Sequence, residues 1–344
     1  PLPRRRTRTA PLPPRGGLTA SRLRVPADTT VTAFELVSAA VRGQRHRHPE
    51  DDDAAVRARF AAGEVVLADA APLAAEDRLT AGTDVWFYRM PAPEAPVPGE
   101  VKVVYADRDI TVVDKPPFLA TVPRGAHVTE TLVVRLRRAT GNEEIAPAHR
   151  LDRATSGLVL CTNRREVRGA YQGLFESGVV AKTYEAVDRY DQALAEGAGA
   201  VSRLPGAASG RGAGGVVWSS RIEKTRGILQ AREVPGTANA VTELGSVVRS
   251  TGDCGMIADS CGSRGGAHPG WAVYRLHPRT GKTHQLRVHM NAAGVPICND
   301  PLYPEILPDG WGEFDHPLML KSVELSFTDP LSGERRQFRT RGWN

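Results

Sequence analysis

The chain has 344 residues, a length that suggests two domains or one large domain with an appendage. Of these residues 41% are hydrophobic and 24% are charged, a balance typical of a soluble globular protein. Its four cysteines are too few for a disulfide scaffold, no apolar run is long enough to span a membrane, and the N-terminus lacks the apolar stretch of a secretory signal. The formal net charge of +6 is supplied by seven arginines within residues 1–25, so the total charge does not by itself indicate nucleic-acid binding. We therefore expect a cytoplasmic protein.

The N-terminal part of the sequence divides into three predicted segments. Residues 1–25 are a basic lead-in rich in proline and arginine, residues 26–90 form a small domain, and residues 91–99 form a stiff, proline-rich linker. Within the small domain, the patterning predicts helices at residues 31–41 and 54–62 and strands at residues 64–67 and 85–88. His46 and His48 have no cysteine or third histidine nearby in the sequence, so we expect a solvated loop there and no metal.

Residues 100–344 have the pattern of a mixed α+β domain. Apolar runs predict strands at residues 102–105, 110–113, 158–161, 182–187 and 271–276. Capping residues predict three helices, which begin at Thr129, Asn163 and Thr283 and end at Gly141, Gly178 and Gly294. Two glycine-rich stretches, residues 191–215 and 245–270, interrupt the pattern and are predicted to be loops or insertions.

The segment HRLDRATSGL (residues 149–158) is the first candidate for chemistry. It places Asp152 between Arg150 and Arg153, directly before a turn and a buried strand. A carboxylate between two guanidinium groups stays ionised and can act as a nucleophile or a base. The alternative is an ordinary ion pair on a surface loop.

A second candidate is the basic segment from Arg275 to Met290. It contains no acidic residue, and its loop opens a predicted helix, so backbone N–H groups and Lys282 could bind phosphate. Arg287 lies about one turn into that helix and could reach a neighbouring carboxylate. The alternative is a basic helix that faces solvent.

Together these segments resemble the RluA-type pseudouridine synthases, with HRLDRATSGL as the signature and RTGKTHQLRVHMNAAGVPICNDPLY as the downstream motif. The segments VVYADRDITVVDKPPFLATVPRG, KTYEAV and TANAVTEL are similar to further family segments in the same order. The resemblance covers residues 100–330 and implies an α+β catalytic fold, in which helices and loops flank a mixed, mostly antiparallel sheet. GEVVLADAAPLAAEDRLTAGTDVWF, within residues 26–90, resembles part of a small S4-like RNA-binding appendage; a purely structural role is the alternative.

The resemblance also implies roles for individual residues. Asp152 would be the catalytic aspartate, Tyr184 would pack against the target base, and Arg287 would pair with the Asp152 carboxylate. Arg150 would fill the space in the RNA that the flipped base leaves, and Leu286 would line the uracil pocket. The remaining expected RNA-binding residues are His149, Lys282 and Arg153. For Tyr184 and Leu286 the alternative is an ordinary place in the core.

The implied reaction breaks the bond between N1 and C1′ of a uridine, turns the uracil, and joins C5 to C1′. It oxidises nothing and releases no group, so we expect neither a cofactor nor a metal. The carboxylate could attack C1′ or C6, or assist formation of a glycal. A base buried in a stack must be flipped out first, at a cost of a few kcal/mol.

The implied partner is rRNA or tRNA, and the expected state is a monomer with no membrane association. One alternative is an RNA-binding assembly or folding factor that keeps the fold without turnover. A glycosidase would need a second acid near Asp152, and no motif supplies one.

Overall fold

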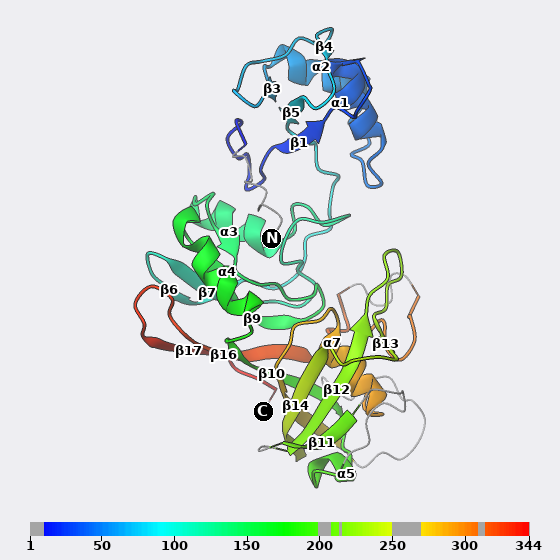
Figure 1. The fold of residues 1–344 in the computed structure, drawn as a ribbon, viewed down its shortest axis with the longest axis vertical. Coiled ribbons are helices and arrows are strands. Elements are labelled where there is room, and N and C mark those ends of the chain that lie inside the picture. The colour runs from blue at the N-terminus through cyan, green and yellow to red at the C-terminus, as the bar shows by residue number, and fades with distance from the viewer. Residues whose placement is uncertain (1–9, 199–207, 213–214, 250–269, 309–313, 344) are drawn as a thin grey trace. The chain divides into compact units, whose positions relative to one another are not determined.

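The computed structural model describes residues 10–198, 208–212, 215–249, 270–308 and 314–343 (Figure 1). The chain divides into two compact units. The first unit contains Pro1–Pro96 and Val122–Glu143, and the second contains Val97–Thr121 and Glu144–Asn344. No helix among the described residues is both long enough and apolar enough to cross a membrane.

The first unit is built on a small antiparallel sheet with the strand order β1 (Ser21–Arg24), β5 (Asp84–Phe87) and β3 (Val65–Leu67). Two helices, α1 (Ala33–Arg42) and α2 (Asp53–Ala61), and a short pair of strands, β2 (Val31–Thr32) and β4 (Arg78–Leu79), complete it. The predicted helices and strands of residues 26–90 are therefore present. The likeness to an S4 module stays a prediction.

The first strand of this unit lies inside the segment that we expected to be a lead-in. All four residues of this strand, Ser21–Arg24, pair with β5. Leu23 packs against the core of the unit, while Arg22 and Arg24 approach the buried Asp84 carboxylate to 3.9 and 3.7 Å. Arg22 and Arg24, which we expected in a loose basic segment, thus lie on one face of a strand whose other face is apolar.

Helix α3 (Leu132–Thr140) also belongs to the first unit, although its sequence lies in the range that we assigned to the catalytic domain. Arg137 and Arg138 donate hydrogen bonds to the carbonyl oxygens of Gly17 and Gly16. Thr131, not Thr129, caps the helix, because Thr129 is engaged by the carboxylate of Glu94. Gly141 ends the helix in the left-handed conformation, as predicted.

The second unit is built on one long sheet (Figure 1). Its main path runs β11 (Ala208–Gly212), β12 (Gly215–Glu223), β14 (Ala240–Arg249), β15 (Trp271–Pro278), β10 (Ala181–Arg189), β16 (Leu320–Thr328), β9 (Ser156–Thr162), β7 (Ile110–Lys115) and β6 (Lys102–Ala106). Further pairs join β13 (Arg232–Val234) to β12, β17 (Arg335–Arg339) to β16, and β8 (Ala146–Pro147) to β9. Among the described residues only β16 and β9 pair in parallel, so the predicted mixed, mostly antiparallel sheet is confirmed.

The parallel pair requires a glycine. Gly157 has a φ of +107°, and a Cβ atom on it would lie 2.2 Å from the carbonyl oxygen of Ser322. Every residue of β9 is buried, as expected for a strand that reads as a continuous apolar run. The strand that follows the Asp152 loop, β9, is therefore held by close contact with β16.

The helices of the second unit are α4 (Arg168–Glu176), which follows the short helix η1 (Arg165–Val167), the single turn α5 (Gln192–Ala195), and α7 (Gln285–Ala292). The predicted caps at Asn163 and Thr283 are wrong. The Asn163 side chain instead bonds to Thr111 and to the carbonyl of Asp107. The N-cap residue of α7 is His284, whose side chain makes no capping hydrogen bond.

The two glycine-rich stretches are only partly loops. Residues 208–212 form β11, and residues 245–249 continue β14. The remainder of the second stretch, including Cys254 and Cys261, lies largely outside the described residues. These segments therefore extend the sheet at its β11–β12–β14 end.

Candidate active site

Asp152 lies on the loop that joins β8 to β9, and the second unit holds this loop from two sides. The Thr121 hydroxyl donates to the carbonyl of Leu151 at 2.8 Å and accepts from its amide at 3.2 Å. The Lys115 ammonium donates to the carbonyl of Arg153 at 3.3 Å. The residues on both sides of Asp152 are thus fixed, while its own side chain stays 29% exposed. A fixed but reachable carboxylate suits a reacting group.

The guanidinium of Arg287 faces this carboxylate. It projects from α7, is buried, and approaches Asp152 Oδ2 to 3.8 Å through Nη1. Its Nε and Nη2 donate to the two oxygens of Asp300 at 2.7 and 2.6 Å. Burial lowers the pKa of Arg287, but the hydrogen bonds to Asp300 together with the charges of Asp300 and Asp152 outweigh it, so the pKa is raised. The bidentate pair therefore leaves one edge of the guanidinium to face Asp152.

His284 approaches Asp152 from the start of α7. Its Nε2 lies 3.9 Å from Asp152 Oδ2, and its Nδ1 lies 3.0 Å from the hydroxyl of Tyr303. Burial and the charge of Arg287 lower the pKa of His284 to about 4, although the charges of Asp152 and Asp300 oppose this. The imidazole is therefore neutral near pH 7.

Lys115 lies on the other side of the loop and is completely buried. Besides Arg153, its Nζ donates to the carbonyls of Pro116 and Leu119 at 2.9 and 2.8 Å, which uses the three protons of an ammonium. Burial lowers the pKa of Lys115 to about 7, against the attraction of Asp152. Lys115 therefore holds the backbone that carries Asp152.

Tyr184 and Leu286 are two further buried residues of the second unit. Tyr184 projects from β10, which pairs with β15 on one side and with β16 on the other. Burial raises the pKa of Tyr184 to about 12, and the charge of Asp152 adds to this. Leu286 follows His284 on α7 and is 6% exposed. The fold thus brings together Asp152, Tyr184 and Arg287, which come from three distant sequence segments, while Leu286 is buried on α7.

Comparison with known proteins identifies this arrangement. The family model of RNA pseudouridylate synthase matches residues 109–292, which is more than half of the chain and includes Asp152, Tyr184 and Arg287. The chain belongs to this family. Its members are isomerases that form pseudouridine in RNA, so the predicted fold class, enzyme class and RluA-type resemblance are confirmed.

Individual relatives of this pseudouridine synthase are distant. An uncharacterized RNA pseudouridine synthase of Bacillus subtilis (strain 168), YjbO, is 28% identical over 249 residues, which cover 71% of this chain and 72% of the relative. The dual-specificity RNA pseudouridine synthase RluA of Vibrio cholerae is 29% identical over 67% of this chain and 79% of its own length. A solved structure, human RNA pseudouridylate synthase domain containing 1, is 24% identical with a TM-score of 0.45, and covers 71% of this chain and 85% of that chain.

Three of the residues that we expected to contact RNA in this synthase lie at the surface. Arg150 and Arg153 are exposed on the two sides of Asp152, and Lys282 is exposed in the loop before α7. Their positive side chains are therefore placed where a phosphate backbone could reach them.

His149 is located differently from what we expected. Its ring stacks on Phe175 with the ring centroids 4.1 Å apart, and its Nε2 accepts a hydrogen bond from the Leu160 amide at 3.1 Å. Burial lowers the pKa of His149 to about 3. The structure therefore gives His149 a packing role, because alternation along the signature directs it inward while Arg150 faces out.

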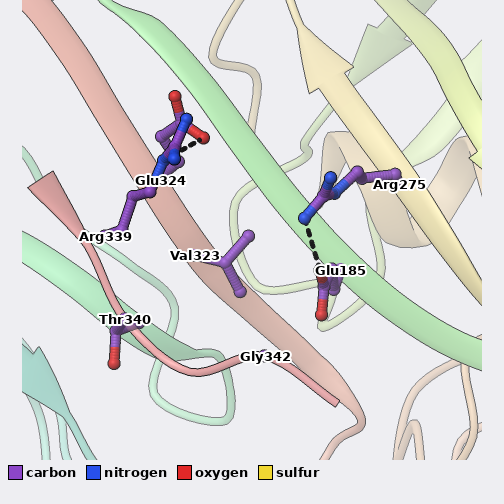
Figure 2. A pocket seen from close by; sticks show the side chains of 7 residues that line it. All are labelled: Glu185, Arg275, Val323, Glu324, Arg339, Thr340 and Gly342. Carbon is purple, nitrogen blue, oxygen red and sulfur yellow. Dashed lines mark hydrogen bonds and ion pairs between the residues drawn. The ribbon is translucent and has the colours of Figure 1, made fainter. Parts of the chain in front are cut away.

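A cavity of about 270 Å³ lies away from this site (Figure 2). Glu185 lines it, and because neighbouring residues of a strand point to opposite faces, it opens on the face of β10 opposite to Tyr184. The Glu185 carboxylate accepts from Arg275 at 3.1 Å and from the Trp343 amide at 2.9 Å. Its lining charges are thus already paired, and it does not reach Asp152.

Sequence reasoning gave no role to His284, Asp300, Tyr303 or Lys115. All four stand inside the segments that carry the family resemblance. For Asp300 the sequence did contain a signal. Asp300 is the first acidic residue after the acid-free stretch that contains Arg287, and a buried arginine needs an acidic partner.

Proposed function

We propose that this synthase isomerises uridines of rRNA or tRNA and that Asp152 is the carboxylate that acts on the nucleotide. The observation that carries the proposal is the approach of Arg287 to Asp152 at 3.8 Å on a loop whose backbone is held by Lys115 and Thr121. A monomer in the cytoplasm stays our expectation for its state and location.

The reaction needs an ionised carboxylate beside the ribose. Attack on C1′ displaces the uracil with the N1–C1′ electron pair, attack on C6 turns the ring while it is bound, and removal of a ribose proton gives a glycal. Each route requires Asp152 to reach a nucleotide and to keep its orientation. Arg287 supplies that orientation, because Asp300 fixes it in turn.

RNA would be recognised outside this pocket. The flipped nucleotide enters between Asp152 and Tyr184, while the exposed Arg150 takes the space that it leaves in the RNA. Arg153 and Lys282 contact phosphates, which are recognised by charge and shape more than by base identity.

The test is to incubate the protein with unmodified 16S, 23S and total tRNA transcripts separately and to count pseudouridine in each by mass spectrometry. Pseudouridine at defined positions of one class of RNA supports the proposal and names the target. Tight binding without pseudouridine in any of them would favour the assembly-factor alternative and overturn it.

A further inference from the structure

The hydroxyl of Tyr303 determines which nitrogen of His284 carries a proton. This hydroxyl lies 2.7 Å from the amide of Ala231, 2.9 Å from the carbonyl of Ala231 and 3.0 Å from His284 Nδ1. An amide can only donate and a carbonyl oxygen can only accept, whereas an imidazole nitrogen can do either. We assign the phenol proton to the carbonyl, because otherwise two oxygens would face each other at 2.9 Å with no proton between them. The hydroxyl therefore has only an acceptor lone pair left for the imidazole. His284 Nδ1 must carry the proton that it donates.

The other nitrogen of the neutral ring is then unprotonated. Its lone pair lies on Nε2, which is 3.9 Å from Asp152 Oδ2, too far for a hydrogen bond and close enough to reach the same nucleotide. The His284 side chain is 11% exposed, so little water competes for Nε2. The structure thus places a basic nitrogen, Nε2 of His284, next to Asp152.

The backbone holds this nitrogen in place. His284 adopts a φ of +59° directly before α7, a left-handed conformation that is uncommon for residues other than glycine, although histidine adopts it more often than most. Tyr303 anchors the ring through Nδ1 and is itself buried and bonded twice to Ala231. Such strain persists only where the surroundings determine the conformation, and it is concentrated at functional sites.

The reaction needs a base after C5 has joined C1′. At that stage C5 carries both C1′ and its original hydrogen. Resting on the proposed role of Asp152, we propose that Nε2 of His284 removes this proton. The C5–H electron pair becomes the C5=C6 double bond, the C6=N1 pair returns to N1, and N1 takes up a proton. The exchange is a proton transfer from C5 to N1, so no oxidant or other reactant is required.

The charges around the ring suit a base that is neutral before the step and charged after it. Arg287 and Lys224 lower the proton affinity of His284, and Asp152 and Asp300 raise it. Burial raises the pKa of Tyr303 to about 12, so its hydroxyl keeps its proton even at alkaline pH. The imidazolium formed in the step faces the Asp152 carboxylate, which stabilises it until the proton leaves.

The variant that isolates Nε2 is His284→Asn. The amide nitrogen of asparagine can replace Nδ1 as the donor to Tyr303, and asparagine tolerates the left-handed backbone, but no basic nitrogen remains at the position of Nε2. The rate of pseudouridine formation is measured with RNA whose uridines carry hydrogen or deuterium at C5, on the full chain. A general base contributes about 10²- to 10⁴-fold. We expect a loss of that order, with a deuterium isotope effect larger than in wild type and partial rescue by added imidazole.

Two results would overturn the inference: an unchanged rate, or a slower rate with the wild-type isotope effect and no rescue, which indicates a structural role. Should the variant not fold, ¹⁵N spectra of histidine-labelled wild type decide instead. A proton on Nδ1 and none on Nε2 supports the inference, and the reverse contradicts it. The proposed function fails separately, if Asp152→Asn forms pseudouridine at the wild-type rate.

Discussion

Arg287 and Asp300 form a buried, two-point ion pair, with Nε and Nη2 donating to the two carboxylate oxygens at 2.7 and 2.6 Å. The side chain of Asp300 has no exposed surface and that of Arg287 has 4%. Asp300 also accepts from the amide of Leu302 at 2.8 Å. The pair thus ties α7 to the loop after it and fixes the guanidinium that faces Asp152.

The first prediction concerns this pair. Asp300→Asn removes the two-point counter-charge of the buried Arg287 and leaves it only the partly exposed Asp152, 3.8 Å away. We therefore expect the free energy of unfolding to fall by about 3–5 kcal/mol and pseudouridine formation to fall more than tenfold at a temperature where the variant is folded. Urea denaturation and tritium release from RNA labelled at C5 of uridine measure the two effects. The control is Glu76→Gln, which breaks an exposed pair with Arg57 and should cost less than about 1 kcal/mol. Equal effects of the two variants would contradict the prediction.

The second prediction concerns the contact between β9 and β16. In Gly157→Ala the new methyl group would lie 2.2 Å from the Ser322 carbonyl oxygen, at a φ of +107°. We expect a loss of well over 4 kcal/mol, or no soluble protein, because backbone must move in two central strands. Gly173→Ala in α4 meets nothing within 4 Å and should stabilise by about 0.5–1 kcal/mol. Similar unfolding midpoints for both variants would be inconsistent with this packing.

The third prediction separates His149 from Arg150. His149→Phe keeps the stacking on Phe175 but removes the acceptor for the Leu160 amide, so we expect a destabilisation of about 1–3 kcal/mol and unchanged RNA affinity. Arg150→Ala should do the opposite: weaker binding at low salt and unchanged stability. Filter binding and thermal unfolding give both quantities. Weaker RNA binding by folded His149→Phe would restore our original expectation for this residue.

The fourth prediction concerns the decrease of kcat/KM at acid pH. Since burial lowers the pKa of His284 from 6.5 to about 4, its basic form persists well below neutral pH. We expect kcat/KM to be flat between about pH 5 and 7 and to decrease only as the pH approaches 4. A histidine with its ordinary pKa would give a decrease that begins near pH 6.5. If kcat/KM begins to decrease near pH 6.5 in protein shown to be folded, the pKa of His284 is not lowered.

Stability must be followed in the same samples. The folded-state pKa values of His149, His284 and His289 are lowered to about 3, 4 and 4, so the unfolded chain takes up protons first as the pH falls below 6.5. The stability present above pH 6.5 is therefore lost progressively as the pH falls, down to about pH 4 for His284 and His289 and about pH 3 for His149. Unfolding midpoints at each pH separate this loss from the titration of the reacting base.

Local signals in the sequence were enough for much of the fold. Gly141 and Gly294 end α3 and α7 with positive φ, and the apolar run at residues 158–161 became the buried centre of β9. Each of these features depends on neighbours within one turn or one strand. The segments that resemble the family then predicted Asp152, Tyr184 and Arg287 as site residues. The order of these segments along the chain indicated the family, which the spacing of residues within one segment could not do.

Features that depend on distant partners were missed. Asn163 has the spacing of a helix cap, but its bonds to Thr111 and Asp107 take the side chain instead. Helix α3 was assigned to the catalytic domain because its contacts with Gly16 and Gly17 span more than a hundred residues. The protonation of His284 depends on the Tyr303 hydroxyl and Ala231, which no local pattern connects to it.

The most direct measurement is tritium release from bulk cellular RNA labelled at C5 of uridine, with wild type, Asp152→Asn and Asp152→Glu side by side. Release by wild type alone, with all three proteins folded and bound to RNA, is the predicted result, because neither variant leaves an ionised oxygen at the position that Arg287 holds. Release by Asp152→Asn at the wild-type rate would contradict the central role of this carboxylate.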